Sequence, residues 1–298
     1  MSSPTVSMDA TEPSLSATDR EAVLTWYRPR RSGFPWRRAR PDPYAVLVSE
    51  VMLQQTQVAR VGPAFDRFVD LFPDVHALAA ASRADVIRAW AGLGYNRRAV
   101  ALHEAARVIV RDHRGHVPRD EATLRALPGV GPYTAGAVAS IAFGARVPAL
   151  DVNVRRVVAR AVCGAETDGV AAADLREAAS GFLDPADPGA WNQALMDLGR
   201  EVCRPVPRCG ICPLAQGCRA RAAGRLGAPP PRRQAPFAGS SRQVRGRIVG
   251  TLRERTSATE EELVLTVGDS APRVAAAVYG LVRDGILERA GQAYRLRA

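Results

Sequence analysis

The sequence contains no lysine, and all 41 of its basic residues are arginines. A lysine amine is the side chain that forms a Schiff base with a carbonyl substrate. In this chain only the α-amino group of the first residue could form such a Schiff base. Reactions that depend on a lysine imine are therefore excluded for the side chains of this protein.

Long apolar runs are also lacking. No stretch of about 18 or more apolar residues occurs, so the sequence predicts no membrane span. The opening segment, MSSPTVSMDATEPSLSATDRE, is rich in Ser and Thr and carries acids, unlike the basic start and apolar stretch of a secretory signal. We therefore expect a cytoplasmic, nucleoid-associated protein without a membrane partner, and a disordered tail over residues 1–17.

Acidic residues are in the minority, 30 against 41 basic residues, and the net charge is +11. A basic protein of this kind usually binds a polyanion, and nucleic acid is the leading candidate. The replacement of every lysine by arginine has a second explanation, since a GC-rich genome favours arginine regardless of function. Charge alone leaves both interpretations open.

Only five cysteines occur, and four of them lie close together. Cys203, Cys209, Cys212 and Cys218 follow the pattern C-x5-C-x2-C-x5-C. Without a secretory signal, such a cluster indicates a metal site rather than disulfides. Four thiolates on one short loop suit a 4Fe–4S cluster or zinc, and the single C-x2-C pair favours the iron–sulfur cluster. Cys163 lies apart in an apolar stretch and is expected to be a buried small hydrophobe.

A chain of 298 residues is long enough for two domains. Up to about residue 222, apolar residues recur at helical spacing in short segments separated by Gly and Pro, as in ASRADVIRAWAGL and NVRRVVARAV. Residues 223–241 contain GAPPPRRQAP and are predicted to be a linker. Residues 242–298 predict three helices and a hairpin. This pattern suggests a winged-helix-like domain that binds either DNA or another protein.

Two glycines, Gly129 and Gly131, flank Val130 in LPGVGPYTAG, just before a predicted helix. Glycine lets the backbone approach a ligand closely, and N–H groups at a helix N-terminus attract anions. This arrangement is typical of a helix-hairpin-helix, which holds a DNA phosphate through main-chain N–H groups. An ordinary turn between two helices, with Pro128 and Gly129 as turn residues, is the alternative.

Two carboxylates stand in positions that suit acid–base chemistry. Glu50 lies among apolar residues in PYAVLVSEVMLQQTQV, where burial would raise its pKa and make it a proton donor; an exposed helix glutamate is the alternative. Asp151 precedes a predicted helix in VPALDVNVRRVVAR, where it would cap the helix and stay charged beside the helix amides. One protonated and one charged carboxyl group is the pair that cleavage of a glycosidic bond requires.

Several motifs stand together in order: FPWR, PYAVLVSEVMLQQTQV, GLGYNRR, LPGVGPYTAG, LDVNVRRV, WNQALMDLG and the four-cysteine segment. Together they closely resemble the A/G-specific adenine glycosylases, the MutY family of the helix-hairpin-helix superfamily. The resemblance covers about residues 20–220. The segment SEVMLQQTQV distinguishes this family from its endonuclease III relatives.

This resemblance implies an all-α, two-lobed glycosylase domain over residues 18–222, with double-stranded DNA bound in the cleft between the lobes. One lobe would be a six-helix barrel over residues 43–138. The other would combine residues 18–42 and 139–222 and hold the 4Fe–4S cluster. The protein would flip the target adenine out of the duplex and excise it when it is mispaired with 8-oxoguanine or guanine. Since no segment of the sequence resembles a dimer seam, we expect a monomer.

The resemblance also implies the catalytic roles. Glu50 matches the general acid that protonates adenine at N7, and Asp151 matches the carboxylate that stabilises the oxocarbenium-like state. Tyr133 stands where the lyase relatives carry a catalytic lysine. The family pattern and the missing lysine both imply a glycosylase that leaves an abasic site without efficiently cutting the strand.

The remaining matches concern support of the catalytic pair and binding of DNA. The residues are Asn153 in support of the catalytic site; Tyr133 where some members have a catalytic tyrosine; Trp36, Arg37 and Gln193 in the adenine pocket; Gln54 and Tyr95 as side chains that enter the base stack; Gly129, Val130 and Gly131 as phosphate-binding amides; and Cys203, Cys209, Cys212 and Cys218 as ligands of the cluster.

The sequence departs from the family pattern in three places. The usual cysteine spacing is x6-x2-x5, so the first loop here is one residue shorter. The motif usually written LDGNV or LDTNV is LDVNV, which places Val152 where a smaller residue is often found. Many members end in a Nudix-like domain that recognises 8-oxoguanine, whereas this chain has the winged-helix-like segment.

Two other functions are compatible with parts of the sequence. An endonuclease III-like glycosylase and lyase would need the lysine that this chain lacks. A DNA-binding regulator with a redox-active cluster would explain the cysteines and the C-terminal segment, but it would need neither Glu50 nor Asp151. The sequence as a whole favours the monofunctional adenine glycosylase.

Overall fold

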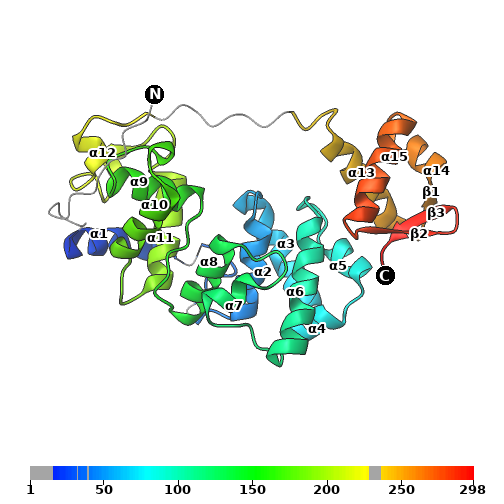
Figure 1. Cartoon of the computed structure of the whole chain (residues 1–298), viewed down its shortest axis with the longest axis horizontal. Coiled ribbons are helices and arrows are strands. Elements are labelled where there is room, and N and C mark those ends of the chain that lie inside the picture. The colour runs from blue at the N-terminus through cyan, green and yellow to red at the C-terminus, as the bar shows by residue number, and fades with distance from the viewer. Residues whose placement is uncertain (1–15, 32, 39, 228–235) are drawn as a thin grey trace. The chain divides into compact units, whose positions relative to one another are not determined.

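The structure is a computed structural model, and it describes residues 16–298 apart from residues 32, 39 and 228–235 (Figure 1). The chain forms two compact units. Unit 1 is built from residues 1–47, 119–126 and 130–231, and unit 2 from residues 48–118, 127–129 and 232–298. The predicted tail up to residue 15 and the middle of the predicted linker, residues 228–235, lie outside the described residues.

Unit 1 is helical in its described part. Two of its helices begin at side chains that cap them: Ser16 forms a capping box with Asp19, and Asp187 accepts a hydrogen bond from the N–H of Ala190 (2.9 Å). The helices that lie wholly in this unit are α1 (Ala17–Tyr27), α7 (Glu121–Arg125), α8 (Pro132–Phe143), α9 (Val152–Ala161), α10 (Ala172–Phe182), α11 (Pro188–Glu201) and α12 (Arg219–Ala222).

The core of unit 1 lies where α9, α10 and α11 run side by side (Figure 1). Trp191 of α11 is fully buried and meets the ring of Phe182 edge-on, with 4.7 Å between centroids. Gly199 decides how closely α11 can approach α9, because a Cβ at this position would lie 2.6 Å from the Cβ of Asn153. The small residue therefore lets α11 pack directly on the first turn of α9.

Unit 2 contains a second group of helices. Its core includes Trp90, which is fully buried and meets the ring of Phe68 edge-on at 5.8 Å. Helix α2 begins in unit 1, and most of its length belongs to unit 2. The helices in this part of the chain are α2 (Pro43–Leu53), α3 (Val58–Leu71), α4 (Val75–Ala80), α5 (Arg83–Ala89) and α6 (Arg97–His113).

The C-terminal elements also belong to unit 2. Helices α13, α14 and α15 gather around a small antiparallel sheet of order β1-β3-β2 (Figure 1). The three predicted helices and the hairpin are present, and the structure adds the short strand β1. The bounds are α13 (Ser241–Glu254), β1 (Ala258–Thr259), α14 (Glu260–Val267), α15 (Ala271–Arg283), β2 (Leu287–Ala290) and β3 (Ala293–Leu296).

The mainly helical fold predicted from the sequence is confirmed over the described residues. The two compact units divide the chain at other places than the predicted lobes do, because α8 packs on α11, and α7 on α8, within unit 1. The predicted lobe and domain boundaries therefore stay predictions. In the described part of the chain, no helix is both long and apolar enough to cross a membrane.

Candidate active site

Glu50 lies on α2 and is buried, with 4% of its surface exposed. The carboxylate of Asp42 accepts hydrogen bonds from the first N–H groups of this helix, and Pro43 occupies the first helical position. The neighbouring residues Ser49 and Val51 are also buried. The alternative of an exposed surface glutamate is therefore wrong.

Arg98 fixes the C-terminal end of the helix that carries Glu50. Its guanidinium donates hydrogen bonds to the carbonyl groups of Val51 (3.0 Å) and Met52 (2.8 Å), and also to that of Gln54. It also reaches the hydroxyl of Thr56 at 2.9 Å. Burial lowers the pKa of Arg98 to about 10, so the side chain remains a cation at neutral pH. One partly buried cation thus binds the carbonyl groups at the C-terminal end of α2.

The same guanidinium reaches the loop of residues 92–96, the Tyr95 loop, through the carbonyl groups of Leu93 and Gly94 (3.2 Å each). Tyr95 is 41% exposed and has a left-handed backbone (φ 46°). A left-handed non-glycine residue costs of order 1 kcal/mol or more, so it persists only where its surroundings hold it. Arg98 therefore ties the segment after α2, which contains Gln54, to the loop that presents Tyr95.

The turn before α8 contains the predicted phosphate-binding residues. Gly129 has a left-handed backbone (φ 75°), and a Cβ there would lie 2.6 Å from the Cβ of Ala101. The carbonyl of Gly129 accepts a hydrogen bond from the side-chain amide of Gln54 (3.4 Å). Val130 is buried, and Gly131 is the N-cap of α8. Only glycine fits position 129 without strain. With no side chain there, the backbone of the turn can approach a ligand closely.

Asp151 caps α9, as the sequence predicts. Its Oδ1 accepts hydrogen bonds from the N–H groups of Asn153 (2.9 Å) and Val154 (2.6 Å), and its Oδ2 accepts one from the Asn153 side-chain amide (2.8 Å). Burial raises the pKa of Asp151, while these N–H donors and the charge of Arg156 act in the opposite direction. The sequence indicates the effect of the helix amides on Asp151, but not the larger effect of burial.

Arg156 connects this carboxylate to the four-cysteine segment. Its guanidinium donates to Oδ1 of Asn153 (2.8 Å), to the carbonyl of Gly199 (2.7 Å) and to the carbonyl of Cys203 (2.6 Å). The amide of Asn153 thus bridges Asp151 on one side and Arg156 on the other. This chain of hydrogen bonds fixes the orientation of the Asp151 carboxylate.

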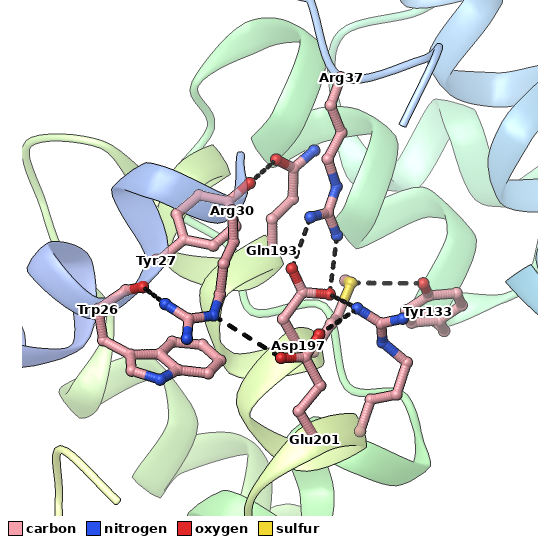
Figure 2. Close-up of polar contacts among 10 residues, drawn as sticks. Trp26, Tyr27, Arg30, Arg37, Tyr133, Gln193, Asp197 and Glu201 are labelled. Atoms are coloured by element: carbon pink, nitrogen blue, oxygen red, sulfur yellow. Dashed lines mark hydrogen bonds and ion pairs between the residues drawn. The ribbon is translucent and has the colours of Figure 1, made fainter. Parts of the chain in front are cut away.

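Arg37 forms a bidentate ion pair with Asp197 of α11, with N–O distances of 2.6 and 3.1 Å (Figure 2). Both side chains are buried, with 8% and 4% of their surface exposed. The guanidinium also lies over the ring of Phe34, 4.8 Å from its centroid, and that ring stacks on Trp36. The predicted pocket residues Trp36 and Arg37 are therefore held together by one buried charge pair and one aromatic stack.

Gln193 lies one helical turn before Asp197 on α11. Its side-chain carbonyl accepts a hydrogen bond from the hydroxyl of Tyr27 (2.5 Å; Figure 2). Burial raises the pKa of Tyr27 to about 12, so the hydroxyl keeps its proton as a donor. The hydroxyl of Tyr133 lies 3.8 Å from the sulfur of Met196 (Figure 2). Three predicted site residues thus meet at helix α11 in unit 1. Gln193 lies on it, and Arg37 and Tyr133 contact it.

The four clustered cysteines are all partly exposed free thiols. Burial, together with the charges of Cys203, Cys218 and Cys209, raises the pKa of Cys212 to about 11. Arg160 donates to the sulfur of Cys203 (3.7 Å). Among the described residues, no group of three or more His, Cys, Asp or Glu has an arrangement that could hold a metal ion. The donor set, four thiols within electrostatic reach of one another, is nevertheless chemically suited to iron and sulfide.

The predicted site residues are distributed over both units. Glu50, Gln54, Tyr95 and Gly129 belong to unit 2, and all the others belong to unit 1. Cys163 is half-buried against the core of unit 1, so it is less buried than the sequence suggests.

Four site residues were missed by the sequence analysis. They are Tyr27, Asp197, Arg98 and Arg156, and each acts through a partner that sequence spacing does not reveal. Asp197 alone left a signal, because it follows Gln193 by one helical turn and so lies on the same helix face.

Comparison with known proteins assigns the fold. The HhH-GPD superfamily of base excision DNA repair proteins matches residues 48–179. A solved thermostable thymine-DNA glycosylase is 30% identical, with a TM-score of 0.63 over 68% of this chain and 95% of that one. A trapped endonuclease III–DNA covalent intermediate has the same fold, with a TM-score of 0.58 at 22% identity over 70% of this chain and 95% of that one. The fold and the helix-hairpin-helix therefore define a DNA glycosylase of the HhH-GPD superfamily.

Closer relatives identify the family. The adenine DNA glycosylase of Mycolicibacterium smegmatis is 46% identical over 90% of this chain and 92% of the relative. The human adenine DNA glycosylase is 45% identical over 68% of this chain and 39% of the relative. The chain belongs to the adenine DNA glycosylase family, and it is an N-glycosylase in the hydrolase class of enzymes.

Proposed function

We propose that this enzyme removes adenine mispaired with 8-oxoguanine or guanine in double-stranded DNA and leaves an abasic site. The relatives named as adenine DNA glycosylases support the adenine substrate. The observation that carries the chemistry is two carboxyl groups, the buried Glu50 on α2 and the partly buried Asp151 at the start of α9. Each is oriented by its own helix, as acid–base chemistry requires.

Glu50 donates a proton to N7 of the flipped adenine. Protonation draws electrons from the bond between N9 and C1′ of the sugar, and adenine leaves with that electron pair. The sugar becomes an oxocarbenium-like cation. Water then adds to C1′, and the Glu50 carboxylate takes up the proton that the water loses.

Asp151 stabilises the positive charge that develops on the sugar. Its two oxygens already accept three hydrogen bonds, two from Asn153 and one from Val154, so the carboxylate does not have to reorient during the reaction. Because the carboxylate is partly buried, its attraction to a cation is stronger than it would be in water.

Strand cleavage through an imine has no side chain to support it, because the chain has no lysine. Tyr133, which stands at the position of the lyase lysine, has a phenol in place of an amine. The product is therefore an abasic site in an intact strand.

DNA contacts three parts of the chain: the turn before α8, the segment after α2 that contains Gln54, and the Tyr95 loop. The N–H groups of Gly129, Val130 and Gly131 bind a phosphate at the N-terminus of α8. Gln54 and Tyr95 enter the base stack as the adenine leaves it, which suits an exposed aromatic ring.

Cys203, Cys209, Cys212 and Cys218 would hold a 4Fe–4S cluster. Arg156 and Arg160 donate hydrogen bonds to Cys203, so two cations are available to balance the charge of the bound thiolates. The purified protein should contain iron and acid-labile sulfide in equal amounts, as measured by chemical analysis. One zinc ion with no sulfide would contradict this assignment.

A single-turnover assay tests the function. Duplexes with adenine opposite 8-oxoguanine, guanine, cytosine or thymine are incubated with excess enzyme, and strand breaks are measured with and without alkali. Excision is expected opposite the two guanines, with breaks mainly after alkali. It should be lost in Asp151→Asn. Binding without adenine release would overturn the proposal and favour a DNA-binding regulator.

The same assay has an expected pH dependence. Only the charged form of Asp151 stabilises the cation, so the rate should fall as pH falls through the pKa of Asp151. Because burial raises that pKa, this loss should begin at a higher pH than for an ordinary aspartate, whose pKa is about 3.9.

A further inference from the structure

The C-terminal elements of unit 2 pack against the helices that precede the Tyr95 loop. Ala84 and Ile87 of α5 belong to the same buried apolar cluster as Val244, Ile248 and Leu252 of α13. Part of the buried face of α5 (Arg83–Ala89) is therefore covered by residues from the end of the chain. This continuous core makes the contact a specific one.

Arg253 extends from α13 to both ends of the segment that contains the Tyr95 loop. Its Nε donates to the carbonyl of Ile87 (3.1 Å), and its Nη2 donates to the side-chain Oδ1 of Asn96 (3.2 Å). Asn96 is the residue directly after Tyr95 and the N-cap of α6. One partly buried guanidinium thus contacts the chain both before and after the Tyr95 loop.

A second contact from the C-terminal elements holds Arg97, the residue after Asn96. Asp284, at the end of α15, is buried and forms ion pairs with Arg245 of α13 and with Arg97 of α6 (3.6 Å to Arg97). The C-terminal elements therefore contact Asn96 and Arg97, the two residues that follow Tyr95.

The Tyr95 loop needs this support. Gly92, Gly94 and Tyr95 all have left-handed backbones, with φ of 85°, 67° and 46°. From the side of the helix core, the loop is held by Arg98 and by the indole of Trp90, which donates to the carbonyl of Gly94 (3.1 Å). From the other side, the described contacts come from the C-terminal elements.

We propose that the C-terminal elements brace the Tyr95 loop, with Arg253 as the residue that positions it for entry into the base stack. This inference rests on the proposed function, in which Tyr95 enters the stack as adenine leaves. Arg253 is a positioning residue, because it acts on Tyr95 through Asn96. The C-terminal segment thereby contributes to extrusion of the base through contacts within the protein.

Substitution in the full-length protein tests the brace. Arg253→Met keeps most of the apolar stem and removes both hydrogen bonds. Amide hydrogen exchange of residues 92–98 in the free protein should become about tenfold faster, since the loop opens more often. Single-turnover excision from a mispaired duplex should slow about tenfold. The rate on adenine in an unpaired bubble, which needs little extrusion, should change less than about twofold.

Arg247→Met is the matched control. Arg247 donates to the carbonyl of Val267 (2.9 Å), so its loss removes a similar bond inside the C-terminal elements. It should leave both the exchange of residues 92–98 and the duplex rate unchanged. Arg253→Lys, which can keep one of the two hydrogen bonds, should lie between the wild type and Arg253→Met. A merely structural effect would slow excision from the duplex and the bubble equally.

The outcomes separate this inference from the proposed function. If the wild type releases adenine but Arg253→Met leaves exchange and rate unchanged, the brace is wrong and the function stands. If the wild type releases no adenine from any substrate, the function fails, and the exchange comparison still decides whether Arg253 holds the loop. Slower excision in Tyr95→Ala on the duplex, with a normal rate on the bubble, would support the role of the loop.

Discussion

Replacing Glu50 by glutamine is expected to slow adenine release by about 10²–10⁴-fold, the usual contribution of a general acid. Glutamine has nearly the same shape, but its amide cannot donate a proton to N7 at neutral pH. Glu50 is buried on α2, and its helix is fixed at its end by Arg98, so the substitution should leave the position of the side chain unchanged. Single-turnover kinetics on a mispaired duplex measure the effect.

Glu104→Gln is the matched control for this prediction. Glu104 is a glutamate of α6 in the same unit, paired with Arg83, and it has no part in the proposed chemistry. Its substitution should change the rate by less than about twofold. If Glu50→Gln binds DNA normally and retains more than about a tenth of the wild-type rate, another group supplies the proton and the assigned mechanism is wrong.

Local sequence signals predicted the elements that carry the site. The N-cap position of Asp151 follows from its place directly before a helical apolar pattern, and the structure confirms it. The burial of Glu50 follows from the apolar residues on either side of it, and it is also confirmed. Both signals lie within a few residues of the side chain concerned, which is why the sequence alone reveals them.

The long-range contacts left no such signal. Arg37 and Asp197 are 160 residues apart, and Arg253 and Ile87 are 166 residues apart. In a chain with 41 arginines, sequence does not show which of them are buried against a carboxylate or a carbonyl. Burial also added an effect that the sequence did not show, because packing in unit 1 raises the pKa of Asp151 while the amides of α9 lower it.

The buried pair of Arg37 and Asp197 should have a large effect on stability. Arg37→Met removes the cation and leaves the Asp197 carboxylate buried, which typically costs about 3–5 kcal/mol in the free energy of unfolding. Arg200 also contacts Asp197, at 2.9 Å, so we expect a loss near the lower end of this range. Urea denaturation followed by circular dichroism measures the loss, with Arg30→Met, at an exposed ion pair with Glu201, as the control.

The double variant Arg37→Met with Asp197→Leu distinguishes a buried charge from lost packing. Removing both charges eliminates the uncompensated carboxylate, so most of the lost stability should return, even though the ion pair is absent. A double variant less stable than Arg37→Met would show that the pair is net stabilising and contradict this account. The restored stability should not restore activity, because the guanidinium lies over Phe34, the ring that stacks on Trp36, and keeps these residues in position for the adenine.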